Sequence, residues 1–256
     1  MLIRIKFAKL EPVKFIGHLD TMRYFQKVLF RSALPVRYSE GFNPHPLLEF
    51  ANPLGVGISS SGEYLDFELT KDLDPKEVED AVKGALTTGF EFVRLTVLND
   101  RVQGVKKASA MSLVDRADYL LYIEDIEKGL KDEVLSAFRE YISADSIMIS
   151  APTKKTERVF DLKENLFGFG TSLGEFLSVT GSDPEDEKCN LEEEENGLYL
   201  YLRLSSGSAM NIRPEIVLDS FTETKAPGVK TSDFAMHRIE MFHNTETGAV
   251  PLWAVK

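Results

Sequence analysis

The chain has 256 residues, of which 30 are basic and 41 acidic, so its formal net charge is −11. Its 43% hydrophobic and 28% charged residues are ordinary for one or two globular domains. The single cysteine, Cys189, excludes an internal disulfide and a cysteine-ligated zinc or iron–sulfur site within this chain, and it indicates a reducing compartment. No run approaches about 18 apolar residues, so we expect a cytoplasmic protein without a membrane partner.

Charge is unevenly distributed along the chain. Residues 1–45 contain eight basic and three acidic residues, a local excess of +5. Residues 183–195 contain eight acidic residues and one lysine, which predicts a solvated loop because like charges repel. The global charge argues against nonspecific nucleic-acid binding, whereas the local excess allows a basic face within the first 45 residues.

The first hundred residues alternate between strand and helix patterns. Apolar residues alternate with charged ones from Ile3 to Phe7, which predicts a half-buried strand. Apolar residues then recur at helical spacing from Met22 to Leu29, in a helix that begins near His18 and ends at Leu34-Pro35. Further strands are predicted at 36–38, 47–50, 64–69 and 90–98, and a second helix at 75–86. The order β-α-β-β-α-β predicts a ferredoxin-like split βαβ domain over residues 1–100.

The pattern restarts after residue 117. Residues 101–117 are polar and rich in small side chains, which predicts a linker. Strands are expected at 119–123, 146–150, 158–162, 198–204 and 237–242, with helices at 133–142 and 213–221. The sequence therefore predicts an α+β protein whose second α+β domain, of similar style, spans residues 118–256 and carries an acidic insertion near 165–196.

Three basic residues on the first helix, Arg23, Lys27 and Arg31, lie four positions apart. Each step of four residues turns the helix by only about 40° beyond a full turn, so the three form one stripe opposite the apolar side. A stripe of this kind suits contacts with phosphates along a nucleic-acid backbone. The alternative is a solvated face of an amphipathic helix. Arg37, just beyond the helix, would extend the stripe.

The loop Gly41–Pro46 (GFNPHP) is the most unusual local feature. Prolines on both sides of His45 restrict the backbone, and the proline after Asn43 favours an extended conformation there. A rigidly displayed imidazole suits acid–base catalysis, metal binding or contact with a base, and Phe42 adds a ring for stacking. A purely structural turn is the alternative.

His18, Asp20 and His45 are the candidate catalytic residues. His18 and Asp20 lie at the start of the first helix, where capping and the helix dipole offer a structural alternative. If the loop 41–46 meets this helix start, the three side chains share one site. Two histidines and a carboxylate can bind a metal, but we predict no metal site. Arg213 precedes a predicted helix, where it would contact an anion or brace the junction.

Several segments together resemble a known family. They are Phe15–Asp20 (FIGHLD), Gly41–Pro46, Pro53–Gly57 (PLGVG), Ser61–Asp66 (SGEYLD) and Ile212–Glu215 (IRPE). The chain resembles the radical SAM-linked (radical SAM-associated) protein family, a domain of unknown function. The resemblance is dense over residues 1–70 and thins to scattered matches further on. It departs at Leu86–Gly89 (LTTG), where the family has a Leu-Pro-x-Gly turn.

The resemblance implies an accessory role. Family members occur alone or as C-terminal extensions of radical S-adenosylmethionine enzymes, and their association implies a role in RNA modification or ribosome biogenesis. A radical SAM enzyme is thus the implied partner, with RNA as a further one. One cysteine cannot supply the three-cysteine cluster motif, so any radical chemistry belongs to the partner and no cofactor is expected here.

Three functional hypotheses follow, and we favour a role without catalysis. The first is an RNA-binding or substrate-presenting accessory of a radical SAM enzyme. Its candidate nucleic-acid-binding residues are Arg23, Lys27, Arg31, Arg37, Phe42, Asn43, His45 and Arg213. The second is an RNA- or nucleotide-directed enzyme that uses His45 or His18 as a general base, with Asp20 orienting a ring. The third is a protein–protein adaptor without RNA contact.

Overall fold

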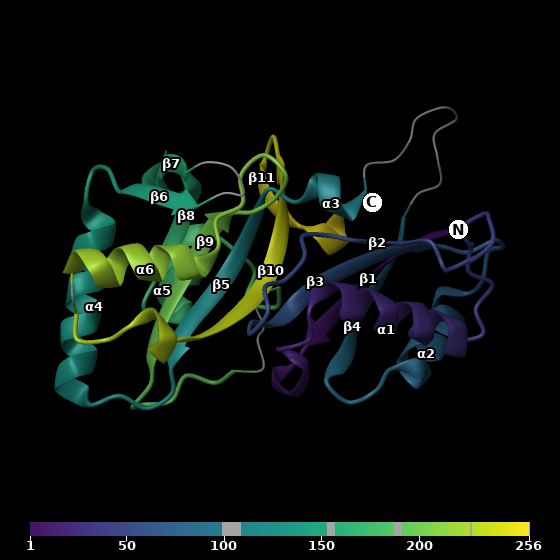
Figure 1. The fold of residues 1–256 in the computed structure, drawn as a ribbon, viewed down its shortest axis with the longest axis horizontal. Coiled ribbons are helices and arrows are strands. Elements are labelled where there is room, and N and C mark those ends of the chain that lie inside the picture. Colours follow the sequence, from purple (N-terminus) through teal and green to yellow (C-terminus); the bar gives the residue numbers. More distant parts are fainter. Residues whose placement is uncertain (99–108, 153–156, 187–190, 226, 256) are drawn as a thin grey trace. The chain divides into compact units, whose positions relative to one another are not determined.

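The computed structural model describes residues 1–98, 109–152, 157–186, 191–225 and 227–255. The chain is a mixed α+β protein that divides into two compact units, Met1–Arg116 with Glu240–Lys256, and Ala117–Ile239 (Figure 1). The C-terminal segment, which the sequence pattern assigned to the second domain, therefore groups with the first unit. Cys189 and part of the predicted linker 101–117 lie outside the described residues, and Ala110–Leu113 of that linker forms the short helix α3.

The first unit is built around the strand order β4-β1-β3. Strand β1 is antiparallel to both β3 and β4, and the short β2 pairs antiparallel with β3. Strand β10 (Ala235–Thr245), which spans the boundary between the units, pairs with β11. The other elements are β1 (Leu2–Lys9), α1 (His18–Arg31), β2 (Leu48–Phe50), β3 (Ser59–Glu68), α2 (Pro75–Ala85), β4 (Phe90–Leu98) and β11 (Gly248–Pro251).

Helices α1 and α2 lie next to each other along this sheet (Figure 1) and enclose the core of the first unit. Phe25 of α1 and Val82 of α2 are fully buried against Ile5 and Phe7 of β1. The Phe7 and Phe25 rings have centroids 4.4 Å apart. Burying side chains of this size contributes roughly 1.5–3 kcal/mol each, which fixes α1 on the sheet. The predicted apolar periodicity of this helix is confirmed.

The second face of β1 is also buried, so the prediction of a half-buried strand is wrong. Arg4 is 1% exposed, and its guanidinium donates to the two carboxylate oxygens of Asp66 at 2.8 and 2.9 Å. It also donates to the carbonyl oxygen of Leu252 at 2.9 Å, 248 positions away in the sequence. The returning C-terminal segment therefore covers the side that local alternation assigned to solvent.

A second basic residue of β1 is also buried and paired with a buried acidic residue. Lys6 donates to one carboxylate oxygen of Glu240 at 2.5 Å, and the Tyr64 hydroxyl donates to the other at 2.6 Å. Burial is the main reason why the pKa of the Glu240 carboxyl is raised, although Lys6 opposes the shift. Burial and the neighbouring Glu240 also raise the pKa of Tyr64. This ion pair and its hydrogen bonds offset the cost of burying the charged groups only while each group keeps its partner.

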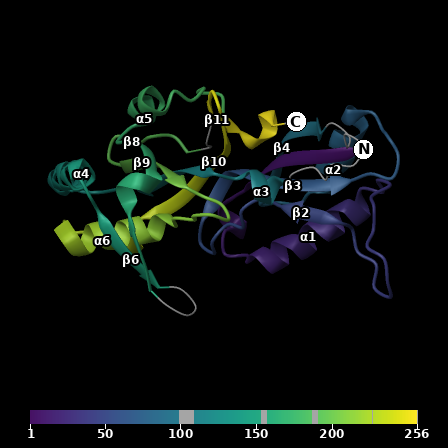
Figure 2. The same ribbon diagram turned by 90° about the horizontal axis from the view of Figure 1, so that it is seen from above.

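The second unit contains the strand order β5-β9-β8 and a separate two-stranded sheet of β6 and β7. Figure 2 shows α5 and α6 on opposite sides of β8 and β9. In the part of the chain that the structure describes, no helix is long and apolar enough to cross a membrane. The elements are β5 (Arg116–Ile123), α4 (Lys128–Ser143), β6 (Met148–Pro152), β7 (Glu157–Asp161), β8 (Leu166–Gly170), α5 (Leu173–Thr180), β9 (Leu198–Ser205) and α6 (Pro214–Lys225).

The segment predicted as an acidic insertion, 165–196, supplies regular structure to this unit. Strand β8 pairs antiparallel with β9, and Phe176 of α5 is fully buried and stacks on Tyr201 with centroids 5.6 Å apart. The charge run begins only at Asp183, after these elements have ended. The apolar residues that precede the acidic run belong to the core of this unit. The acidic composition of the segment as a whole did not indicate this.

A half-buried ion pair in the second unit should make its stability pH-dependent. Arg139 donates to both carboxylate oxygens of Glu175 at 2.8 and 2.9 Å, and the Thr171 hydroxyl donates as well. The hydrogen bonds from Arg139, followed by those from Thr171, lower the pKa of Glu175 from 4.5 to about 2.

Because this folded-state pKa is depressed, Glu175 stabilises the fold above pH 4.5, and its contribution is lost as the pH falls toward 2. Glu175→Gln should therefore lower the unfolding free energy by about 1 kcal/mol at neutral pH, since solvent screens the pair, and by less near pH 2. Urea denaturation at several pH values measures this difference. A deficit that stays constant with pH would argue against the pair as its source.

Candidate nucleic-acid interface

Helix α1 presents three basic side chains on the side away from the core. Arg23, Lys27 and Arg31 are exposed, whereas the buried residues of the helix lie on its opposite side. At 1.5 Å per residue, the row they form is about 12 Å long. Phe30, in the last turn beside Arg31, is 75% exposed. We call Arg23, Lys27 and Arg31 the basic row.

Neighbouring carboxylate and carbonyl groups pair with some of these basic side chains. Arg23 lies 3.1 Å from the Asp20 carboxylate, one turn earlier on α1. Arg31 donates to the carbonyl oxygen of Ala85 at 2.8 Å. Arg37 donates to Glu68 at 3.0 Å. The Arg23 and Arg37 pairs are exposed, whereas the Arg31 hydrogen bond is partly buried. Each guanidinium keeps further donor groups, because it carries five N–H donors.

The surface carries less positive charge than the sequence count of +5 suggested. Three of the eight basic residues in 1–45, namely Arg4, Lys6 and Lys9, are buried. Five basic residues therefore remain outside the core against three acidic ones. Four of these five basic residues lie on α1 or in the segment that follows it, and the fifth, Lys14, precedes α1 and pairs with Glu11.

The segment Arg37–Leu47, which we call hairpin 37–47, carries the GFNPHP loop. Its ends are held together by a hydrogen bond from the Leu47 N–H to the Arg37 carbonyl at 2.9 Å. The predicted strand 36–38 is reduced to isolated bridges, one of which joins Tyr38 to Pro46. At the turn, Gly41 has φ of +116°, a value that favours glycine because it has no Cβ. Phe42, the next residue, is completely exposed.

His45 is exposed, and Ser39 fixes its orientation. The Ser39 Oγ accepts the backbone N–H of His45 at 3.1 Å and lies 3.0 Å from Nδ1 of its ring. A hydroxyl that already accepts from the backbone N–H is well placed to donate its own hydrogen to Nδ1. The carbonyl oxygen of Asn43 is a more distant neighbour of Nδ1, at 3.3 Å.

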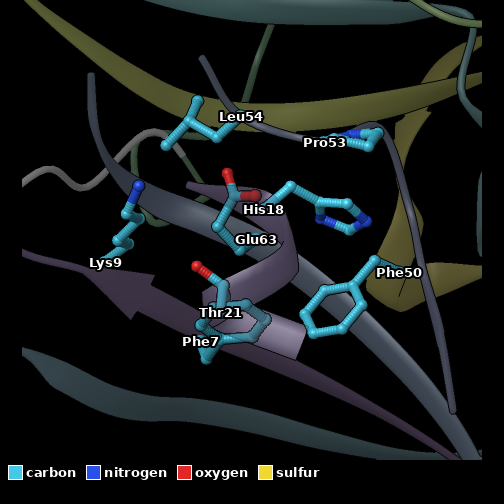
Figure 3. Close-up of a pocket in the computed structure, with 8 residues that line it drawn as sticks. All are labelled: Phe7, Lys9, His18, Thr21, Phe50, Pro53, Leu54 and Glu63. Atoms are coloured by element: carbon cyan, nitrogen blue, oxygen red, sulfur yellow. The ribbon is translucent and has the colours of Figure 1, made fainter. Parts of the chain in front are cut away.

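His18 lines a small cavity at the start of α1 (Figure 3). The cavity has a volume of about 20 Å³, enough for one water-sized group and far below the several hundred Å³ of common ligand sites. The His18 ring packs edge-on against Phe50, with centroids 5.4 Å apart. Buried Lys9 donates to the carbonyl oxygens of Lys14 and Ile16 and so fixes the loop before α1. The lining residues are Phe7, Lys9, His18, Thr21, Phe50, Pro53, Leu54 and Glu63.

The structure does not bring His18, Asp20 and His45 into one site. His18 lines the cavity, Asp20 is exposed beside Arg23, and His45 lies on hairpin 37–47. Within the described ranges, no three histidine, cysteine or acidic side chains are arranged to hold a metal. Arg213 is exposed in the second unit, immediately before α6. The basic row and hairpin 37–47 are consecutive in the first unit and form the candidate interface.

One family model matches most of the chain, from residue 2 to residue 214. Its description is "Uncharacterized protein conserved in bacteria (DUF2344)". The chain belongs to the DUF2344 family. The matched range includes the basic row, hairpin 37–47 and Arg213. No curated protein matches this DUF2344 chain.

Among solved structures, the DUF2344 chain is similar to a chain of "Crystal Structure of a Cbf5-Nop10-Gar1 Complex". The sequence identity is 11% and the TM-score is 0.44. The similarity covers 95% of this chain and 51% of that chain, so the present chain spans about half the length of the solved one. A similarity of this degree carries no argument about function.

Sequence reasoning missed two features of the DUF2344 interface. The contact between Ser39 and His45 was not predicted, because no motif marks a serine six positions before a histidine and only the hairpin pairing brings them together. Phe30 follows the two buried residues Val28 and Leu29, and the sequence pattern did not assign it to either side of the helix. A helical projection of residues 18–31 would have placed it near the basic row.

Proposed function

We propose that this DUF2344 chain is a non-catalytic RNA-binding or substrate-presenting accessory of a radical SAM enzyme. The observation that carries the proposal is the combination of the exposed basic row with the exposed rings of Phe30 and Phe42. Cations that hold phosphates and rings that stack on bases are the two components of surfaces that bind single-stranded nucleic acids. In a chain of net charge −11, a row of three cations on one helix supports a directed contact.

The proposed partner is a radical SAM enzyme. The support is the resemblance of residues 1–70, with FIGHLD and GFNPHP, to radical SAM-linked proteins. A chain with one cysteine does not supply a three-cysteine cluster, so in this proposal the partner supplies the radical chemistry and the chain supplies RNA contacts. RNA modification or ribosome biogenesis is the proposed context.

We propose further that the first unit has the ferredoxin-like split βαβ arrangement. The supporting observations are the element order β1-α1-β2-β3-α2-β4 and the antiparallel pairings of β1 with β3 and β4 and of β2 with β3. In this arrangement α1 lies on one face of the sheet with its outer side free to meet a ligand.

A protein–protein adaptor is the second candidate. It is favoured by the neutralisation of Arg23 and Arg37 by Asp20 and Glu68 and by the exposure of apolar side chains such as Phe15 and Val56. Aromatic residues and arginines are enriched at protein interfaces. The enzyme hypothesis has less support, because the His18 cavity takes only a water-sized group and His18, Asp20 and His45 make their contacts in three different places.

Affinity purification of the full chain with and without ribonuclease separates the two candidates. We expect RNA to copurify from untreated extract, and the purified chain to bind an unstructured RNA in a fluorescence anisotropy titration. Retention of protein partners after ribonuclease treatment, without RNA binding by the purified chain, would favour the adaptor and contradict the RNA-binding proposal.

A further inference from the structure

We infer that hairpin 37–47 contacts an unpaired nucleotide, stacking Phe42 on its base while the Nε2–H of His45 donates to an acceptor on the same nucleotide. This inference rests on the proposed RNA-binding function and specifies its substrate class as single-stranded RNA. It also assigns Ser39 as the residue that positions the imidazole.

Phe42 is the most exposed large apolar side chain described in the structure, at 105% of the reference area. No packing within the fold requires a phenylalanine there, so its ring contributes nothing to the core. The positive φ of Gly41 and the Arg37–Leu47 and Ser39–His45 backbone hydrogen bonds hold the turn beneath it. A ring held on a rigid turn loses little conformational entropy when a base stacks on it.

The hydrogen bonds of His45 determine which hydrogen-bonding group of its ring the hairpin offers to a nucleotide. Ser39 accepts the His45 backbone N–H, and its Oγ lies 3.0 Å from Nδ1. In this inference the Ser39 hydroxyl hydrogen goes to Nδ1, which leaves the ring proton on Nε2. Nε2 belongs to the exposed side of the ring, since the contacts described for the imidazole involve Nδ1. With this assignment the exposed group is an N–H donor, which matches a base carbonyl, a base ring nitrogen or a phosphate oxygen.

This pairing of a ring with a donor selects unpaired RNA over duplex RNA. In an A-form duplex the bases are stacked and the deep major groove excludes side chains, so an exposed phenylalanine finds no free base face. An unpaired base offers both a face for Phe42 and edge acceptors for His45. The basic row, in contrast, contacts phosphates and does not distinguish the two forms by itself.

The test compares an unstructured oligouridine with an RNA duplex of the same number of nucleotides, both titrated into the full chain at fixed salt. Phe42→Ala should weaken oligouridine binding by at least about fivefold and leave duplex binding unchanged. His45→Ala should weaken oligouridine binding by about three- to tenfold, and His45→Gln, which keeps an N–H donor, should restore most of it. Val179→Ala, which removes an exposed apolar side chain in the second unit, is the control.

The tautomer is tested separately by ¹⁵N NMR of the His45 ring. We expect a proton on Nε2 in the natural sequence and a shift of the population toward Nδ1–H in Ser39→Ala, with unchanged chemical shifts in the core. Equal losses with both RNAs for Phe42→Ala, or a proton on Nδ1 before substitution, would overturn the inference while RNA binding itself stands. Loss of a protein partner instead of RNA on Phe42→Ala would also overturn it, and failure of the chain to bind either RNA would reject the proposed function.

Discussion

Lys6→Met is expected to lower the free energy of unfolding by about 3–5 kcal/mol at neutral pH. Methionine preserves most of the volume of the lysine side chain, but it leaves the carboxylate of Glu240 buried without a cation. The hydrogen bonds from Tyr64 and the Met241 N–H remain and offset only part of that cost. Urea denaturation followed by circular dichroism measures the change.

The control for this prediction is the double variant Lys6→Met with Glu240→Gln, which removes the buried charge together with its partner. We expect it to recover a large part of the stability lost in K6M. Because burial raises the pKa of Glu240 above 4.5, the protonated carboxyl favours the folded state, so this group stabilises below pH 4.5 and loses its contribution as the pH rises through the folded-state pKa. The deficit of K6M should therefore shrink toward acidic pH. Equal deficits in the single and double variants would indicate lost packing instead.

The double variant Arg23→Ala with Lys27→Ala should weaken binding of an unstructured RNA by about tenfold at 0.1 M salt. Each phosphate contact on single-stranded RNA contributes about 0.7 to the slope of log affinity against log salt, so the slope should fall by about 1.4. Both side chains are exposed, and neither contributes to the core. Arg31 is left in place because its hydrogen bond to Ala85 connects α1 to α2.

The matched control for that variant is Lys76→Ala with Lys83→Ala. It removes the same number of positive charges from α2, where both lysines contact Glu79. We expect RNA affinity and salt slope to stay near those of the natural sequence. If both double variants lose affinity equally, the contribution of α1 is a general charge effect and the basic row is not the binding site.

The sequence predicted the helix and its row correctly because both depend on local spacing. The periodicity from Met22 to Leu29 fixes which side of α1 packs on the sheet, so the exposure of Arg23 and Lys27 follows directly. The exposure of the GFNPHP loop follows in the same way from its turn residues.

Other features depend on contacts between distant residues and were not predictable from local pattern. Arg4 and Lys6 have the alternation of solvent-facing residues, but their partners Leu252 and Glu240 come from the end of the chain. The count of +5 in residues 1–45 thus included charges that the fold buries. The proposed meeting of His18 with His45 also failed, because His18 packs against Phe50 beside the small cavity whereas His45 is held by Ser39 in hairpin 37–47.

Photochemical crosslinking of a bound unstructured RNA to the full chain, followed by mass spectrometry of the crosslinked peptides, tests the proposed interface most directly. Our account predicts crosslinks within His18–Leu47, at Phe30 on α1 and at Phe42 and His45 on hairpin 37–47. Crosslinks confined to the second unit, or RNA binding that leaves this segment unmodified, would contradict it.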